Sequence, residues 1–248
     1  MLEHAIEGEV SRETLIGMLI HHAGMPALLR SKALSGVARD LVGFGIPPSA
    51  NDMLEGSDHK ITLVFASRIR KDQQINFRFV WPPSLVDATG KCRGEAKLTL
   101  ASTPILDPRF GSEFVRINIE AALQQENFDK DQKPSWKGRL DPLYLPGKAE
   151  SPVIEAERIE HGLKWSPIKV HARNMRGVGK SSNWRLFVSY LTRAAEDMPE
   201  EGIPFTAILT ISDPNGEKPI FNEMRQVLMA GGVIVEDIRI ASRVATRV

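Results

Sequence analysis

Histidine and aspartate side chains can bind a metal ion, but their spacing in this sequence argues against a shared site. His21 and His22 are neighbours in a predicted helix, where consecutive side chains point about 100° apart, so one metal ion cannot bind both from one face. The other histidines show no ligand spacing: His4, His59, His161 and His171. Three aspartates are too irregularly spaced for a calcium loop: Asp129, Asp131 and Asp141. We therefore predict structural or surface histidines, no catalytic, cofactor-binding or metal-binding residue, and no cofactor.

The segment Gly177-Val178-Gly179-Lys180-Ser181 is partly similar to a phosphate-binding loop. That motif needs a glycine five residues before Gly179, where Asn174 stands, and a helix whose N-terminal N–H groups face the phosphate. A strand is predicted to follow instead. We interpret the segment as a flexible basic loop.

Cys92, the single cysteine, lies between Lys91 and Arg93, and such cations can lower the pKa of a thiol. No general base is evident near it, so we interpret Cys92 as unreactive. One cysteine excludes an internal disulfide and is typical of a protein from a reducing compartment.

Two features could contact a partner, and each has a structural alternative. Arg68, Arg70 and Lys71 form a basic cluster at a strand end, which is also the usual protection of a strand edge against aggregation. Trp136 lies in a polar stretch, where a large aromatic side chain can anchor a partner or hold the stretch on its own domain.

The composition is that of an ordinary globular protein of 248 residues, with 42% hydrophobic and 25% charged residues. A formal net charge of +1 argues against a surface for nucleic acid or anionic membranes spread over the molecule. No apolar run approaches the roughly 20 residues of a membrane span, and the first residues lack a secretion-signal pattern. We therefore predict a cytoplasmic protein.

Helical periodicity dominates Ser11–Leu54. Ser11 is a good N-cap, and four residues share one helical face that we expect to be buried: Leu15, Met18, Leu19 and His22. Gly24 and Pro26 end this helix. The pattern then predicts a second helix over Ala27–Val42, a turn at Gly43-Phe44-Gly45 and a short helix over Ala50–Glu55.

From His59 onward the apolar residues alternate with a period of two, which indicates strands. Ile61–Phe65 and Ile75–Phe79 are predicted to form a hairpin through Lys71-Asp72-Gln73. Asn127–Glu150 is polar and rich in proline, and is predicted to be a long linker. A helix is predicted over Ile220–Met229. The remaining predicted strands are Ala96–Ala101, Phe114–Ala122, Pro167–Ala172, Trp184–Leu191, Phe205–Ser212 and Val233–Ile240.

The stretch Ser11–Leu54 resembles the end of the catalytic domain of subtilisin-like serine peptidases. Thr14–Ala23 is similar to the helix after the one that carries the nucleophile, Gly43–Pro47 to the glycine-bounded aromatic turn, and Ala50–Leu54 to the closing helix. The rest resembles the β-rich C-terminal extension of large bacterial members. The matching segments are Ile61–Phe65, Val80–Leu85, Leu98–Arg109, Lys164–Val170, Trp184–Leu191 and Phe205–Asp213.

The catalytic segments of that family have no counterpart here. Its triad needs an aspartate, a histidine and a serine, carried by an Asp-Ser/Thr-Gly, a His-Gly-Thr and a Gly-Thr-Ser segment. Asp87-Ala88-Thr89-Gly90 has an extra residue, His161-Gly162 is followed by leucine, and the sequence contains no Gly-Thr-Ser. No catalytic residue is therefore transferred, and we predict that this chain does not hydrolyse peptides.

Together these patterns predict an α+β chain with a helical remnant over residues 1–56 and a β-rich, mainly antiparallel sandwich-like domain over residues 57–248, with a long loop near residues 126–160. The resemblance implies a non-catalytic region that supports the peptidase or binds a substrate or protein partner. The alternatives are a free-standing protein-binding sandwich and an enzyme of another class. The remnant should be only marginally ordered, with an apolar patch that drives self-association, unless this chain itself covers its apolar stripe.

Overall fold

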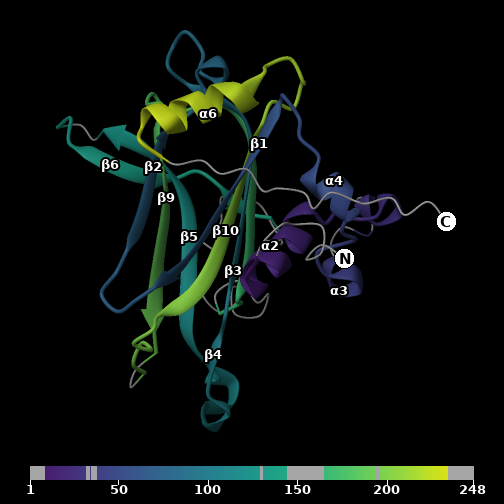
Figure 1. Ribbon diagram of the computed structural model, residues 1–248, viewed down its shortest axis with the longest axis vertical. Helices are drawn as coiled ribbons and strands as arrows, with labels where there is room; N and C mark the ends of the chain where they lie inside the picture. The colour runs from purple at the N-terminus through teal and green to yellow at the C-terminus, as the bar shows by residue number, and fades with distance from the viewer. Residues whose placement is uncertain are drawn as a thin grey trace.

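The computed structural model describes residues 9–31, 34, 38–128, 131–143, 165–193 and 196–233. In this part of the chain, antiparallel strands form two sheets that face each other as a sandwich (Figure 1). Sheet one contains, in spatial order, β1 (Lys60–Ile69), β10 (Ile203–Ser212), β3 (Cys92–Ser102), β8 (Ile168–Val178) and β7 (Asp141–Pro142). Sheet two contains β2 (Ile75–Val80), β9 (Asn183–Thr192), β5 (Val115–Phe128) and β4 (Ile105–Leu106), and β6 (Pro134–Gly138) pairs with the other end of β5.

Helices precede the sandwich and cover part of it. The described part of the chain begins with α2 (Arg12–His22), the 3₁₀ turn η1 (Ala27–Arg30), α3 (Ala38–Val42) and α4 (Ala50–Leu54), and its last element is α6 (Ile220–Ala230). Two further 3₁₀ turns are η2 (Pro83–Leu85) and η3 (Pro108–Glu113). The predicted α+β class with a mainly antiparallel β part is confirmed.

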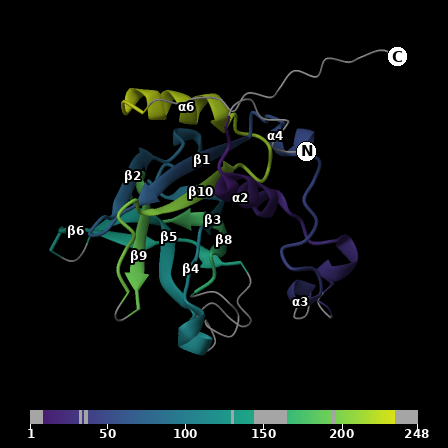
Figure 2. The same ribbon diagram turned by 60° about the horizontal axis from the view of Figure 1, so that its bottom comes forward.

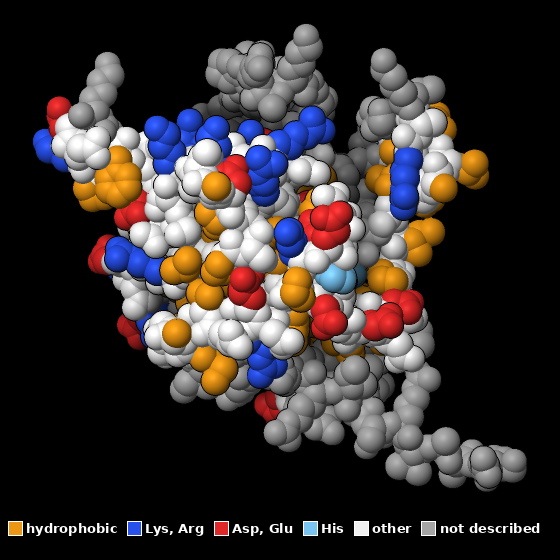
Figure 3. Space-filling view, turned by 90° about the horizontal axis from the view of Figure 1, so that it is seen from above, with side chains coloured by type: hydrophobic (Ala, Val, Ile, Leu, Met, Phe, Trp, Pro, Cys, Tyr) orange, Lys and Arg blue, Asp and Glu red, His pale blue; other side chains and the backbone are white. Residues whose placement is uncertain are grey.

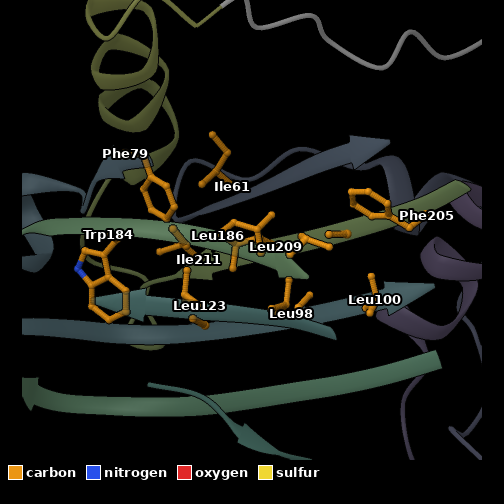
Figure 4. Close-up of a cluster of buried hydrophobic side chains, with 14 of the residues drawn as sticks. Ile61, Phe79, Leu98, Leu100, Leu123, Trp184, Leu186, Phe205, Leu209 and Ile211 are labelled. Atoms are coloured by element: carbon orange, nitrogen blue, oxygen red, sulfur yellow. The ribbon is translucent and has the colours of Figure 1, made fainter. Parts of the chain in front are cut away.

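Alternating apolar side chains of both sheets fill the space between them (Figure 4). On β3 and β10 the inward residues Leu98 and Leu209 are completely buried. Trp81 and Trp184 pack on each other with tilted rings whose centroids lie 4.4 Å apart, and the Trp81 indole N–H donates to the Arg93 carbonyl over 3.0 Å. Both large aromatics are thus buried without an unpaired indole N–H, since that of Trp184 faces the Cys92 sulfur at 3.4 Å.

The predicted hairpin through Lys71-Asp72-Gln73 is wrong. β1 pairs with β10 in sheet one and β2 pairs with β9 in sheet two, so this turn carries the chain from one sheet to the other. The alternation of apolar residues shows that each strand has one apolar face. It does not show whether the two strands are hydrogen-bonded neighbours in one sheet or face each other across the core. Phe65 and Phe77 accordingly meet across the sandwich, with ring centroids 4.6 Å apart.

Two other predicted segments differ in the structure. The single helix over Ala27–Val42 is instead η1 followed by extended Ser31 (φ −62°, ψ 145°), with α3 at its far end; residues 32, 33 and 35–37 lie outside the described part. The predicted linker contains the end of β5, all of β6 and β7. Proline is tolerated at strand starts and edges, which is why a proline-rich stretch can still pair.

The other predicted strands and the helix over Ile220–Met229 are confirmed, although β5 and β8 each extend six residues beyond the predicted ends at Ala122 and Ala172. α6 lies across one end of the sandwich (Figure 1) and buries Ile220, Met224 and Leu228, one residue per turn. The predicted strand Val233–Ile240 lies, after its first residue, outside the described residues.

Candidate protein-interaction surfaces

Helix α2 docks on the outer face of sheet one through small and polar residues. Thr14, Gly17, Met18 and His21 are its buried residues, whereas Leu19 is 36% exposed. The predicted buried stripe of Leu15, Met18, Leu19 and His22 is therefore rotated by about one residue from the real one. The reason is the surface beneath the helix, which presents threonines: Thr14 and Thr206 hydroxyls lie 2.8 Å apart.

His21 is the polar centre of this contact. Its Nδ1 lies 2.9 Å from the Thr99 hydroxyl and its Nε2 lies 2.7 Å from the Thr210 hydroxyl. Burial, followed by the nearby charges of Lys97 and other cations, lowers the pKa of His21 well below 6.5. His21 is therefore a neutral structural residue that joins α2 to the sheet.

Helix α2 approaches the sheet closely at Gly17, where a larger residue would push Ile208 aside by a few tenths of an ångström. A β-carbon there would lie 3.1 Å from Cδ1 of Ile208. Met18 packs on the same isoleucine, and Leu15 and Val64 pack around this small apolar cluster. The structure thus covers much of α2 with the chain's own sheet, although Leu19 stays at the border.

An arm follows α2, which we define as residues 24–47. Gly24 and Ile46 close it by exchanging two backbone hydrogen bonds of 3.0 Å, so the chain leaves and returns at one point. Gly45 has φ +100°, and a β-carbon there would lie 2.4 Å from the Gly24 oxygen, so the closure requires glycine. Figure 2 shows α3 and the adjoining segment set apart from the two sheets.

The arm exposes large apolar side chains. Leu28 is 86% exposed, and Leu41 and Ile46 are each 65% exposed. Seen from above, several groups of hydrophobic side chains lie on the lobe at the right of the view, among polar and backbone atoms (Figure 3). Several large apolar side chains exposed on one short stretch indicate an interaction surface.

A groove lies along the outer edge of β1. The Asp213 N–H donates to the His59 carbonyl, and β1 and β10 pair in register from there onward. Because antiparallel pairs alternate, the odd-numbered residues of β1 bond to β10. The backbone N–H and C=O groups of Thr62, Val64 and Ala66 therefore point to the outer edge, where no described strand pairs with them.

Helices α2, α4 and α6 contribute walls to this groove, whose volume is about 430 Å³. Its apolar lining includes Met53, Phe65, Phe77 and Phe221. Lys60, Arg225 and Glu55 are its charged residues, which gives a net charge of +1 when His22 is neutral. Burial is the main cause that lowers the pKa of His22 to about 4, so it is neutral at physiological pH.

Cys92 and the segment 177–181, which the sequence analysis considered as possible functional sites, have structural roles. Cys92 is fully buried, and burial raises the pKa of its thiol, which agrees with an unreactive cysteine. The segment 177–181 joins β8 to β9, so a strand follows it as predicted. The buried Gln125 amide donates to the carbonyls of Val178 (3.1 Å) and Ser181 (2.7 Å) and holds this loop.

Trp136 holds β6 on its own domain, the second of the two interpretations of this residue. The Arg185 guanidinium lies 4.4 Å from its ring centroid and the Arg78 guanidinium 5.7 Å.

In the basic cluster, Arg68 donates to the carbonyls of Glu201 and Gly202, over 2.8 and 3.0 Å. Lys71 lies 3.8 Å from the Asp197 carboxylate at an exposed position.

Asp87, in the segment nearest to a triad motif, caps its own turn. Its carboxylate accepts hydrogen bonds from Thr89 and Arg93, which lower the pKa of Asp87 far below the usual value.

His59 Nδ1 lies 2.9 Å from the Lys218 carbonyl, and His171 lies on β8. His4, His161 and Asp129 are outside the described residues. Among the described residues, no three His, Cys, Asp or Glu side chains gather closely enough to hold a metal ion.

The sequence analysis missed the threonine-lined docking face and the open edge of β1. Thr206, Ile208 and Thr210 alternate along β10, and this pattern could have shown that the outer face of sheet one receives a polar helix. The open edge could not have been found, because strand order is not encoded in any single strand.

No helix in the described part is long and apolar enough to cross a membrane. Comparison of the chain with protein-family models, with curated proteins and with solved structures finds no match in any of the three.

Proposed function

We propose that this chain is a non-catalytic region of a subtilisin-like serine peptidase, where it supports the protease part or binds its protein partners. The observation that carries the proposal is the arm. Leu28, Leu41 and Ile46 are exposed on the same stretch that resembles the end of a peptidase catalytic domain. Burying such a side chain contributes roughly 1.5–3 kcal/mol, so these residues favour a protein contact.

The arm also suits this role because its ends are fixed. The Gly24–Ile46 closure and the docking of α2 attach it to the sandwich at one place. A partner that covers the arm is thereby positioned relative to the β part. This is how a C-terminal region would support a catalytic domain beside it.

Two experiments test the proposal. The DNA upstream of the Met1 codon should encode, in frame, the Asp, His and Gly-Thr-Ser segments of the family, and a frame without them would refute the peptidase origin. The isolated chain should self-associate through its uncovered arm. Leu28→Glu with Leu41→Glu should give a monomer in light scattering, whereas Leu106→Glu, at an exposed leucine on β4, should not.

A monomeric unmodified chain whose arm amides are protected from hydrogen exchange would contradict this use of the arm. Labelling of the chain by a serine-reactive fluorophosphonate at one defined serine would instead favour the third hypothesis, an enzyme of another class.

The second candidate is a free-standing protein-binding sandwich, and the groove at β1 favours it. We infer that an extended segment of a partner protein adds to the open edge of β1 and places alternate side chains in the apolar groove. The net charge of +1 in the groove favours acidic residues between the apolar ones. Docking of α2 on the chain's own sheet also supports a module that is complete without a catalytic domain.

A synthetic peptide that alternates valine and glutamate is the probe for this groove. Its binding should shift the amide NMR signals of Thr62, Val64 and Ala66. Ala66→Pro removes one outward N–H without touching the ladder to β10 and should abolish these shifts, whereas Ala66→Thr keeps the N–H and should preserve them. Unchanged signals at these amides, or equal binding by the proline variant, would refute strand addition.

A further inference from the structure

A second cavity of about 490 Å³ opens at the side of the sandwich, between β8 of sheet one and β5 of sheet two. β4 covers β5 at Val115 and Ile117, and β6 covers it from Gln124 onward. Between these points, no described strand pairs with the edge of β5. The chain crosses the opening between β6 and β7, where the Arg139 N–H donates to the Leu123 carbonyl over 3.0 Å.

The walls of this cavity are mostly apolar. Leu98, Leu123, Leu140, Val170 and Leu191 are among the lining residues. The volume falls within the roughly 300–1,000 Å³ of small-molecule sites. An inorganic ion would leave these walls in contact with water, so they favour a ligand with a hydrocarbon part.

The ionisable lining residues leave one positive charge uncompensated. Lys169 Nζ donates to the Asn118 side-chain oxygen (2.6 Å), the Ile119 carbonyl (2.6 Å) and the Ser166 carbonyl (3.0 Å), so its protons are used within the protein. Glu120 lies 3.6 Å from the same amine and accepts from the Asn118 amide over 2.7 Å. Lys169 and Glu120 therefore compensate each other, and the positive charge of Arg139 remains.

The Arg139 side chain has an N–H group that no acceptor in the described structure binds. Its Nε atom is buried and has no hydrogen-bond partner in the described structure. A buried donor without a partner costs free energy, which a ligand acceptor would recover. The neighbouring guanidinium of Arg173, by contrast, is engaged with Asp141 (3.8 Å) and with the Arg139 carbonyl (3.4 Å).

We propose that this cavity binds a small amphipathic monocarboxylate, whose carboxylate accepts hydrogen bonds from Arg139 and whose hydrocarbon part packs on the leucines. A carboxylate supplies both the acceptor and the negative charge that the site lacks. This inference does not depend on the proposed peptidase role or on the groove at β1.

Calorimetric titration of the whole chain with octanoate, and with octan-1-ol as its uncharged counterpart, tests the inference. Octanoate should saturate one site and bind at least about tenfold more tightly than the alcohol, the range expected for a hydrogen bond to a charged group. Arg139→Gln should weaken octanoate binding by a similar factor and leave binding of the alcohol unchanged. Arg176→Gln is the matched control, because Arg176 lies on the opposite face of β8 and is exposed.

A second variant addresses the hydrocarbon part. Leu191 lines the cavity yet is 52% exposed, so Leu191→Trp should obstruct the opening without disturbing the core and should weaken both compounds. The inference is overturned if octanoate does not saturate, if the alcohol binds as tightly, or if a folded Arg139→Gln or Leu191→Trp chain binds octanoate like the unmodified one.

Discussion

Protonation of His21 should loosen the contact between α2 and sheet one. The ring is 3% exposed and lies between two threonine hydroxyls, with Lys97 nearby. Its folded-state pKa lies well below 6.5, the value expected once the chain is unfolded. The unfolded chain therefore takes up a proton first as the pH falls, and stability is lost below about pH 6.5.

The size of this effect follows from linkage. A histidine that stays neutral in the folded state lowers the free energy of unfolding by up to about 1.4 kcal/mol per pH unit below its unfolded pKa. Between about pH 7 and about pH 5, the loss is about 2 kcal/mol for His21. His22 adds to the total loss, but it is present in both chains of the comparison below and nearly cancels.

Urea unfolding at these two pH values measures the effect. The free energy of unfolding of His21→Gln should fall by about 2 kcal/mol less than that of the unmodified chain. Met18→Leu changes the same interface without a titratable group and should keep the full pH dependence. Equal pH dependence of His21→Gln and the unmodified chain would refute the assignment of His21 as a buried neutral link.

Three further predictions concern residues that the structure places in tight or stacked contacts. Gly179→Ala should lower the free energy of unfolding in urea by more than about 2 kcal/mol, because φ is +61° and the new β-carbon would lie 2.0 Å from the Gln125 side chain. Gly216→Ala is the control: φ is +67° but no atom lies near the new β-carbon, so it should lower that free energy only by the backbone strain of about 1 kcal/mol. Trp136→Ala should speed hydrogen exchange of the β6 amides by roughly tenfold, from the loss of two contacts with Arg78 and Arg185, and unchanged exchange would contradict this role of Trp136. Cys92 should react with a thiol reagent only at the rate of unfolding, because it is fully buried and its pKa is raised, and fast reaction of the folded chain would show otherwise.

Strand positions could be predicted because each depends on local alternation of apolar residues. Phe205–Ser212 and Trp184–Leu191 have strong patterns, and both are strands in the structure. The assignment of strands to sheets depends on contacts between distant segments. For that reason Ile61–Phe65 and Ile75–Phe79 were expected in one hairpin but belong to opposite sheets.

The candidate surfaces likewise depend partly on local sequence and partly on contacts between distant segments. The sequence predicted Leu28 and Leu41 as part of one helix over Ala27–Val42, whereas the structure exposes both side chains on the arm. The buried face of α2 was misplaced by one residue because threonines below the helix, rather than leucines on it, decide which side is covered.

By itself, the sequence determined where helix gives way to strand, which side chains could enter a core, and the absence of the triad segments, since each depends on residue type and short-range spacing. The tertiary structure alone decided which sheet each strand joins, which face of α2 is buried, and that the edges of β1 and β5 border cavities. The physical reason is that sheet edges and cavities arise where segments distant in the chain meet, and no local pattern records those meetings.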